Sequence, residues 1–167
     1  MLKNFILAAI LSLVLFGCTS VLSNQIIQQA DEKISFQDLQ KQPLRYRGAV
    51  VILGGQIVET VVKEGETWVQ ILQLPLGAEQ RPDITAPSQG RFIMVYKRFV
   101  EPLIYEKGRK ITVAGVVEGS RAITLKDVPY NAPVLLERET YLWKAEAYPV
   151  YRTGPSVQFG IGVGVSR

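Results

Sequence analysis

Side chains able to perform covalent or acid–base chemistry are scarce in this chain of 167 residues. It contains one cysteine, Cys18, and no histidine. The missing histidine excludes Ser-His-Asp and Cys-His nucleophilic machinery and removes the most common zinc ligand. Carboxylates and lysines remain as possible acids and bases. We therefore expect no metal site, and no cofactor other than a covalent group on Cys18.

Cys18 directly follows Leu15-Phe16-Gly17, at the end of an apolar run. Lys3 precedes the run, and residues 5–16 carry no charge, which is the pattern of a signal peptide. The run is shorter than the ~20 apolar residues of a membrane span. Gly17 suits a peptidase pocket for small side chains, so the tetrapeptide resembles a lipobox. The pattern predicts that residues 1–17 are cleaved and that Cys18 carries S-diacylglyceryl and N-acyl groups.

The residue after the cysteine is Thr19 rather than aspartate. This favours delivery to the outer membrane. One acyl chain binds a membrane only marginally, whereas several make attachment effectively permanent. A secretory peptide with an incidental cysteine and an uncleaved N-terminal anchor remain as alternatives.

A second possible chemistry involves Glu64 and Glu66, which lie in a predicted turn beside Trp68. Two carboxylates can hydrolyse a glycosidic bond when one has a raised pKa and they lie ~5 to 10 Å apart. Trp68 would then serve as a sugar platform. Acidic residues in such turns are more often solvated, so a hydrolase acting on envelope glycans is the alternative function.

Positive charge is modest, with a formal net value of +4. The basic residues gather in two small groups, Lys97-Arg98 and residues 107–110. We interpret them as solvated strand ends and turns. If they bind anything, lipid headgroups of the envelope are nearer than nucleic acid.

One short helix is expected near Ser35 to Gln42, where the folded domain, residues 35–167, begins. Ser35 and Asp38 have the spacing of a capping box, and Pro43 ends the helix. Residues 18–34 before it are polar and read as a lipid-anchored tether, more often disordered than packed on the domain.

The rest of the chain is rich in Val and Ile, broken by turn residues, which predicts a mainly β protein. Gly54-Gly55 and Gly115 mark bends, Gly119-Ser120 a turn, and residues 75–90 a long loop that is either functional or a covering flap. This spacing favours a small barrel or sandwich, and of these we expect a curved, partly closed β-barrel. The expected strands are 49–62, 67–74, 92–96, 110–118, 122–125 and 134–143.

The C-terminal residues 159–165 alternate strictly between apolar residues and glycine. Such a segment is typical of a last strand whose bare face lies against another backbone or an aromatic ring. The alternative is a docking strand for a partner or a membrane surface.

Several short motifs occur along the chain from the predicted helix to the last predicted strand of the barrel. They are Phe36-x-x-Leu39, Tyr46-x-Gly48, Gly54-Gly55-x-Ile57, Leu74-Pro75-Leu76, Ser88-x-Gly90-Arg91-Phe92, Glu101-Pro102-x-x-Tyr105-x-x-Gly108-Arg109-x-Ile111-Thr112-Val113-Ala114-Gly115 and Leu142-Trp143. Together with the lipobox, these motifs resemble the starvation-inducible outer-membrane lipoprotein family, Slp. The resemblance implies an outer-membrane lipoprotein facing the periplasm, a small OB-like β-barrel and no established catalytic activity.

Three residues of these segments are expected to be structural rather than catalytic. Tyr105 would pack inward while Arg109 hydrogen bonds to loop carbonyls, and Arg91 would pair with a buried carboxylate. The favoured function is thus non-enzymatic: support of envelope integrity under starvation or stress, with a protein or lipid headgroup as partner. Oligonucleotide binding, which OB-like barrels often serve, is placed last, because fold alone is analogy.

Overall fold

The computed structural model describes residues 20–125 and 127–145. Cys18 and its lipobox, and the expected strand at 159–165, lie outside the described residues. The elements in chain order are α2 (Asn24–Gln29), α3 (Phe36–Lys41), the 3-10 turn η2 (Pro43–Tyr46), β1 (Val50–Lys63), β2 (Glu66–Leu74), the 3-10 turn η3 (Ala78–Gln80), β3 (Arg91–Tyr96), β4 (Lys110–Leu125) and β5 (Val128–Leu142).

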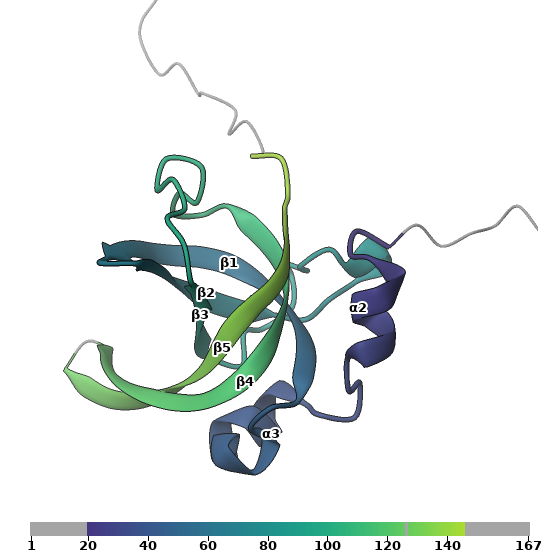
Figure 1. The fold of residues 1–167 in the computed structure, drawn as a ribbon, viewed down its shortest axis with the longest axis horizontal. Coiled ribbons are helices and arrows are strands. Elements are labelled where there is room, and N and C mark those ends of the chain that lie inside the picture. Colours follow the sequence, from purple (N-terminus) through teal and green to yellow (C-terminus); the bar gives the residue numbers. More distant parts are fainter. Residues whose placement is uncertain (1–19, 126, 146–167) are drawn as a thin grey trace, which may run out of the picture.

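The five strands close into a barrel in the order β1-β2-β3-β5-β4 (Figure 1). Every neighbouring pair is antiparallel except β3 and β5, which run parallel. A five-stranded barrel of this kind is an OB-fold. The expectation of a mainly β, OB-like curved barrel is confirmed.

β1 is long and curved, so that it pairs with both of its neighbours. Its first half pairs with β4 and its second half with β2, and both ladders include Gly54 and Gly55. A Cβ on Gly55 would lie 2.2 Å from the backbone oxygen of Leu72. The glycines therefore permit close packing at the bend, while the register shift itself falls between Ile57 and Glu59.

β4 continues through the Gly119-Ser120 position, where a turn was expected. Gly119, with φ +145°, absorbs a register shift instead, and the strand runs on to Leu125. β5 also begins at Val128 rather than residue 134. The prediction of two strands at 110–118 and 122–125 is therefore wrong. The end of β4 and the start of β5 form a hairpin arm that extends from the barrel (Figure 1).

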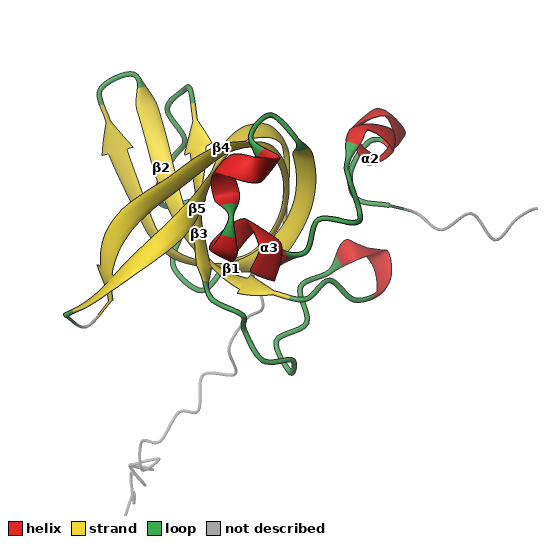
Figure 2. Ribbon diagram, turned by 90° about the horizontal axis from the view of Figure 1, so that it is seen from below, coloured by secondary structure: helices red, strands yellow, loops and turns green. Residues whose placement is uncertain are grey.

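The helix α3 covers one open end of the barrel (Figure 2). The predicted capping box is present, because Ser35 Oγ accepts the Asp38 N–H and the Asp38 carboxylate accepts the Ser35 N–H. Phe36 and Leu39 are buried, and the Phe36 ring packs edge-on against Phe92. The core below them includes Val51, Ile57, Val69, Ile71, Met94, Tyr96, Ile111, Val113, Val117 and Leu135.

The segment expected to be a tether contains α2, which packs on the outside of the barrel. Leu22 and Ile26 are buried against Ala114 of β4. The Ser23 side chain caps α2 and donates to the Glu139 carboxylate of β5 at 2.6 Å. The packed alternative therefore holds over the disordered one from Ser20 onward.

The long loop 75–90 is a covering flap rather than an open loop. Leu76 lies over Gly54, whose Cβ position would be 2.2 Å from the Leu76 Cδ2. Gln80 accepts two hydrogen bonds, from Ser20 Oγ and from Thr112 Oγ1, both at 2.7 Å. The loop thus joins the start of the described chain to β4.

Candidate binding groove

The two carboxylates of the predicted sugar site have different environments. Glu64 is exposed in the β1–β2 turn. Glu66 forms an ion pair with Lys97 at 2.7 Å and accepts the indole N–H of Trp68. These hydrogen bonds, that of Lys97 first, lower the pKa of Glu66. A glycosidase acid needs the opposite shift, so the structure gives the hydrolase hypothesis no support.

The Trp68 ring is covered by two cations. Lys63 Nζ lies 3.6 Å from the ring centroid and Arg121 Cζ lies 4.3 Å from it. Both distances fall within the range of cation–π attraction. Two cationic side chains therefore contact the ring, which does not present a bare platform for a sugar.

Trp68 lies in a shallow groove on the outer face of the barrel, between the β1–β2 hairpin and the arm of β4 and β5. Its volume is about 250 Å³. Alternate residues of each strand point to one face, which places Glu59 and Lys63 of β1 beside Trp68 and Gln70 of β2. The remaining lining includes Ile93 of β3 and Arg121 and Ile123 of the arm.

The arm residues of this groove were not predicted from the sequence. Arg121 and Trp68 are 53 positions apart and meet because β4 curves over β2 and β3. The only local signal is the alternation of Arg121 and Ile123, which places both on one face of a strand. That signal was missed because Gly119-Ser120 read as a turn.

The predicted structural roles hold for two of three residues. The Tyr105 ring packs edge-on against Tyr96, with centroids 5.4 Å apart. Arg109 donates to the carbonyls of Ile104 and Trp143 at 2.7 and 3.0 Å.

Arg91 has a different partner from the one expected. Its guanidinium donates to the amide oxygen of Gln70 at 3.2 Å, not to a buried carboxylate. Arg91 still has a structural role, because this bond links β3 to β2. No charge pair is involved.

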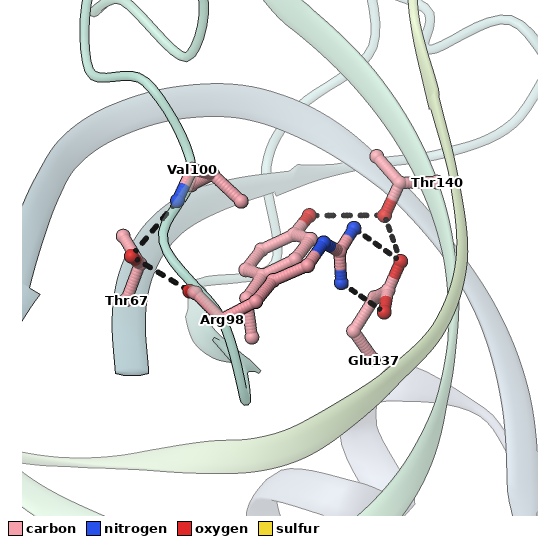
Figure 3. Close-up of polar contacts among 6 residues, drawn as sticks. Thr67, Arg98, Val100, Glu137 and Thr140 are labelled. Atoms are coloured by element: carbon pink, nitrogen blue, oxygen red, sulfur yellow. Dashed lines mark hydrogen bonds and ion pairs between the residues drawn. The ribbon is translucent and has the colours of Figure 1, made fainter. Parts of the chain in front are cut away.

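The first basic group, Lys97-Arg98, is partly exposed but paired. Arg98 forms a bidentate ion pair with Glu137 of β5, at 2.8 and 3.2 Å (Figure 3). Beside it, the Tyr96 hydroxyl hydrogen bonds to Thr140 at 3.0 Å. Burial raises the pKa of Tyr96, which therefore stays neutral. These contacts brace β3 against β5 and leave no free cation for a ligand at Arg98.

Within residues 20–125 and 127–145, no group of three or more acidic or cysteine side chains could hold a metal ion. None of the helices in this part of the chain is long and apolar enough to cross a membrane.

Comparison with known proteins decides the family. The model of the outer membrane lipoprotein Slp family matches residues 15–161. The chain belongs to the Slp family. It is therefore an outer-membrane lipoprotein, as the sequence predicted.

Individual relatives agree with this assignment. Outer membrane protein Slp of Escherichia coli K12 is 31% identical over 122 residues, covering 72% of this chain and 64% of the relative. An uncharacterized protein of Haemophilus influenzae is 33% identical over 110 residues, covering 65% of this chain and 60% of the relative. The matched part thus spans less than two thirds of these two relatives.

Two solved structures show a weak similarity to this chain. Rim1, a mitochondrial single-stranded DNA binding protein of S. cerevisiae, has 14% identity and a TM-score of 0.38, covering 59% of this chain and 97% of Rim1. An OBody, AM3L09, bound to hen egg-white lysozyme has 11% identity and a TM-score of 0.37, covering 59% of this chain and 84% of the OBody. Such values say nothing of ligands, and the fold class follows from the strand order.

Proposed function

We propose that this protein is a non-enzymatic binding module, acylated on Cys18 after removal of residues 1–17 and held on the periplasmic face of the outer membrane. Its role is to support envelope integrity under starvation or stress by holding a partner. Membership of the Slp family supports the membrane address.

The observation that carries this proposal is the position of α2. The helix packs against Val50 and Ile52 at the start of β1, and the groove is lined by Glu59 and Lys63 near its end. An anchor on Cys18, two residues before Ser20, would hold the α2 side of the barrel to the membrane. The groove is lined by residues that differ from those beneath α2, so the docking of α2 leaves it open.

The dimensions of the groove favour a protein partner. Small-molecule sites are commonly ~300 to 1,000 Å³, and this groove is smaller. Tryptophan and arginine are the residues most enriched among interface hot spots, and here Trp68 and Arg121 stack on each other. The groove suits one or two side chains of a protein segment better than a whole substrate.

The anchor is tested with Cys18→Ala in cells lacking the wild-type gene. We expect mass spectrometry of the wild-type protein to show an acylated N-terminal Cys18. The variant should leave the membrane fraction and fail to restore survival under starvation. Full restoration of survival by the unanchored variant would contradict the proposal.

The groove is tested with Trp68→Ala, compared with Ile84→Ala, which truncates an exposed apolar side chain in the loop 75–90. Both variants should fold and fractionate with the membrane. Only Trp68→Ala should lose stress survival. Equal survival of the two variants would remove the groove from the proposal.

A further inference from the structure

The segment 97–109, which joins β3 to β4, presents three large apolar side chains to solvent. We name this segment the apolar loop. Phe99, Leu103 and Ile104 are 62%, 83% and 49% exposed. Exposed apolar groups are ordinary when scattered, but here three of them lie within six residues of one loop.

The apolar loop is held in place rather than loose. The buried Thr67 hydroxyl donates to the Arg98 carbonyl at 3.0 Å and accepts the Val100 N–H at 3.2 Å (Figure 3). Val100 is 5% exposed and anchors the loop in the core. The carbonyl of Glu101 accepts the backbone N–H groups of Ile104 and Tyr105, both at 2.9 Å. A defined framework therefore keeps the apolar side chains outward.

The start of the described chain is connected to the same end of the barrel. Ser20 Oγ donates to the side-chain oxygen of Gln80, and the Gln80 carbonyl accepts the hydroxyl of Thr112, both at 2.7 Å. Cys18 lies only two residues before Ser20. An anchor at Cys18 would therefore lie close to Ser20, which contacts the loop 75–90 directly and β4 through Gln80.

The connection continues from β4 to the apolar loop. Trp143 Nε1 donates to Thr112 Oγ1 at 3.0 Å, and the Trp143 carbonyl accepts Arg109 Nε at 3.0 Å. Arg109 then donates to the Ile104 carbonyl at 2.7 Å. A continuous series of hydrogen bonds therefore links the anchor side of the domain to the exposed apolar side chains.

We propose that the apolar loop is a second membrane contact, in which Phe99, Leu103 and Ile104 enter the interfacial region of the phospholipid leaflet that carries the anchor. Apolar side chains gain free energy at this depth. Lys107, which is exposed near the end of the loop, can place its ammonium group at the level of the phosphates. This inference rests on the proposed acylation of Cys18.

The opposite end of the barrel supplies a matched control. β3 runs from α3, where Phe36 packs on Phe92, to the apolar loop, which follows Tyr96. Leu44, in η2 just after α3, is 71% exposed, close to the 83% of Leu103. The two leucines therefore have the same side chain and similar exposure, and they differ in that they lie at opposite ends of the barrel.

The experiment uses full-length, lipidated protein in vesicles of phosphatidylethanolamine and phosphatidylglycerol. The acylated Cys18 has no free thiol, so Leu103→Cys or Leu44→Cys provides a unique position for the fluorophore NBD. We expect NBD at position 103 to shift to the blue and to be quenched by nitroxide-labelled lipid. NBD at position 44 should do neither.

Three outcomes distinguish the loop contact from the anchor. Quenching confined to position 103 supports the inference. Vesicle-bound protein whose two labels behave alike overturns the loop contact and leaves the anchor standing. Protein that fails to float with vesicles, with mass spectrometry showing no acyl group on Cys18, overturns the proposed anchor and with it the geometry that brings the loop to the bilayer.

A second measurement needs no label. Burying one leucine side chain is worth about tenfold in partitioning. Leu103→Asp should therefore make the lipidated protein about tenfold easier to extract from vesicles with mild detergent, whereas Leu44→Asp should not change extraction. Equal extraction of both variants would overturn the loop contact.

Discussion

The hydroxyl of Tyr130, on β5, hydrogen bonds to both backbone groups of Arg91, on β3. It accepts the Arg91 N–H at 2.8 Å and donates to the Arg91 carbonyl at 2.9 Å. The parallel pairing of β3 with β5 includes only three residue pairs, from Ile93–Val134 to Val95–Leu136. The Tyr130 side chain therefore adds hydrogen bonds beyond the short β3–β5 ladder that closes the barrel.

We expect Tyr130→Phe to destabilise the domain by about 2 kcal/mol. The substitution leaves the Arg91 backbone groups without their partner, together with the Gln40 amide that donates to the same hydroxyl at 2.6 Å. Urea denaturation measures the loss. The control is Tyr141→Phe, because within the described residues the Tyr141 ring packs on Trp143 and its hydroxyl makes no hydrogen bond. An equal effect of the two variants would contradict this account.

A pH titration tests the lowered pKa of Glu66. Because the folded-state pKa is depressed, the ionised carboxylate contributes stability at neutral pH, and this contribution is lost as pH falls through the folded-state value. In a Trp143→Phe protein, fluorescence of Trp68 should change with a midpoint below the ordinary range of glutamate.

The partner of Glu66 is identified by a second variant. Lys97→Ala removes the main cause of the shift and should move the fluorescence midpoint upward. Lys107→Ala removes a basic residue that is not among the causes and should leave it unchanged. If the fluorescence midpoint is the same in Lys97→Ala as in the parent protein, the ion pair does not hold Glu66 ionised in solution.

A pair of glycines tests the close packing at the bend of β1. A Cβ on Gly55 would lie 2.2 Å from the Leu72 backbone oxygen, which cannot move aside without breaking the β1–β2 ladder. We expect Gly55→Ala to cost about 3 kcal/mol or more in thermal unfolding. Gly77→Ala should change stability by less than about 0.5 kcal/mol. Its Cβ would be 3.6 Å from the nearest atom, and its φ is −90°.

Features that depend on neighbouring residues could be predicted from the sequence. Ser35 and Asp38 specify the start of α3 within four residues, and Lys63 to Glu66 specify the first hairpin turn. Segments rich in Val and Ile, broken by turn residues, indicated the strands of the barrel. In each case the interacting groups lie within one turn or one strand, so no knowledge of the tertiary structure was needed.

Features that depend on distant partners were missed. Gly119 is compatible with either a turn or a bulge, and only its pairing with Val134 across the arm shows that the strand continues. Packing of residues 18–34 on the domain was the alternative to disorder, but the surface that receives Leu22 and Ile26, at Ala114, could not be predicted. The covering of Trp68 by Arg121 follows from the same arm.

The docking of α2 limits how far the domain can act. Thr19 alone separates Cys18 from Ser20, and an extended residue spans at most about 3.6 Å. A barrel acylated at Cys18 could not range across the periplasm in search of a partner. Its encounters would occur in a thin layer along the bilayer, where two-dimensional diffusion and surface density set occupancy. The partner would have to reach the membrane, or already reside there.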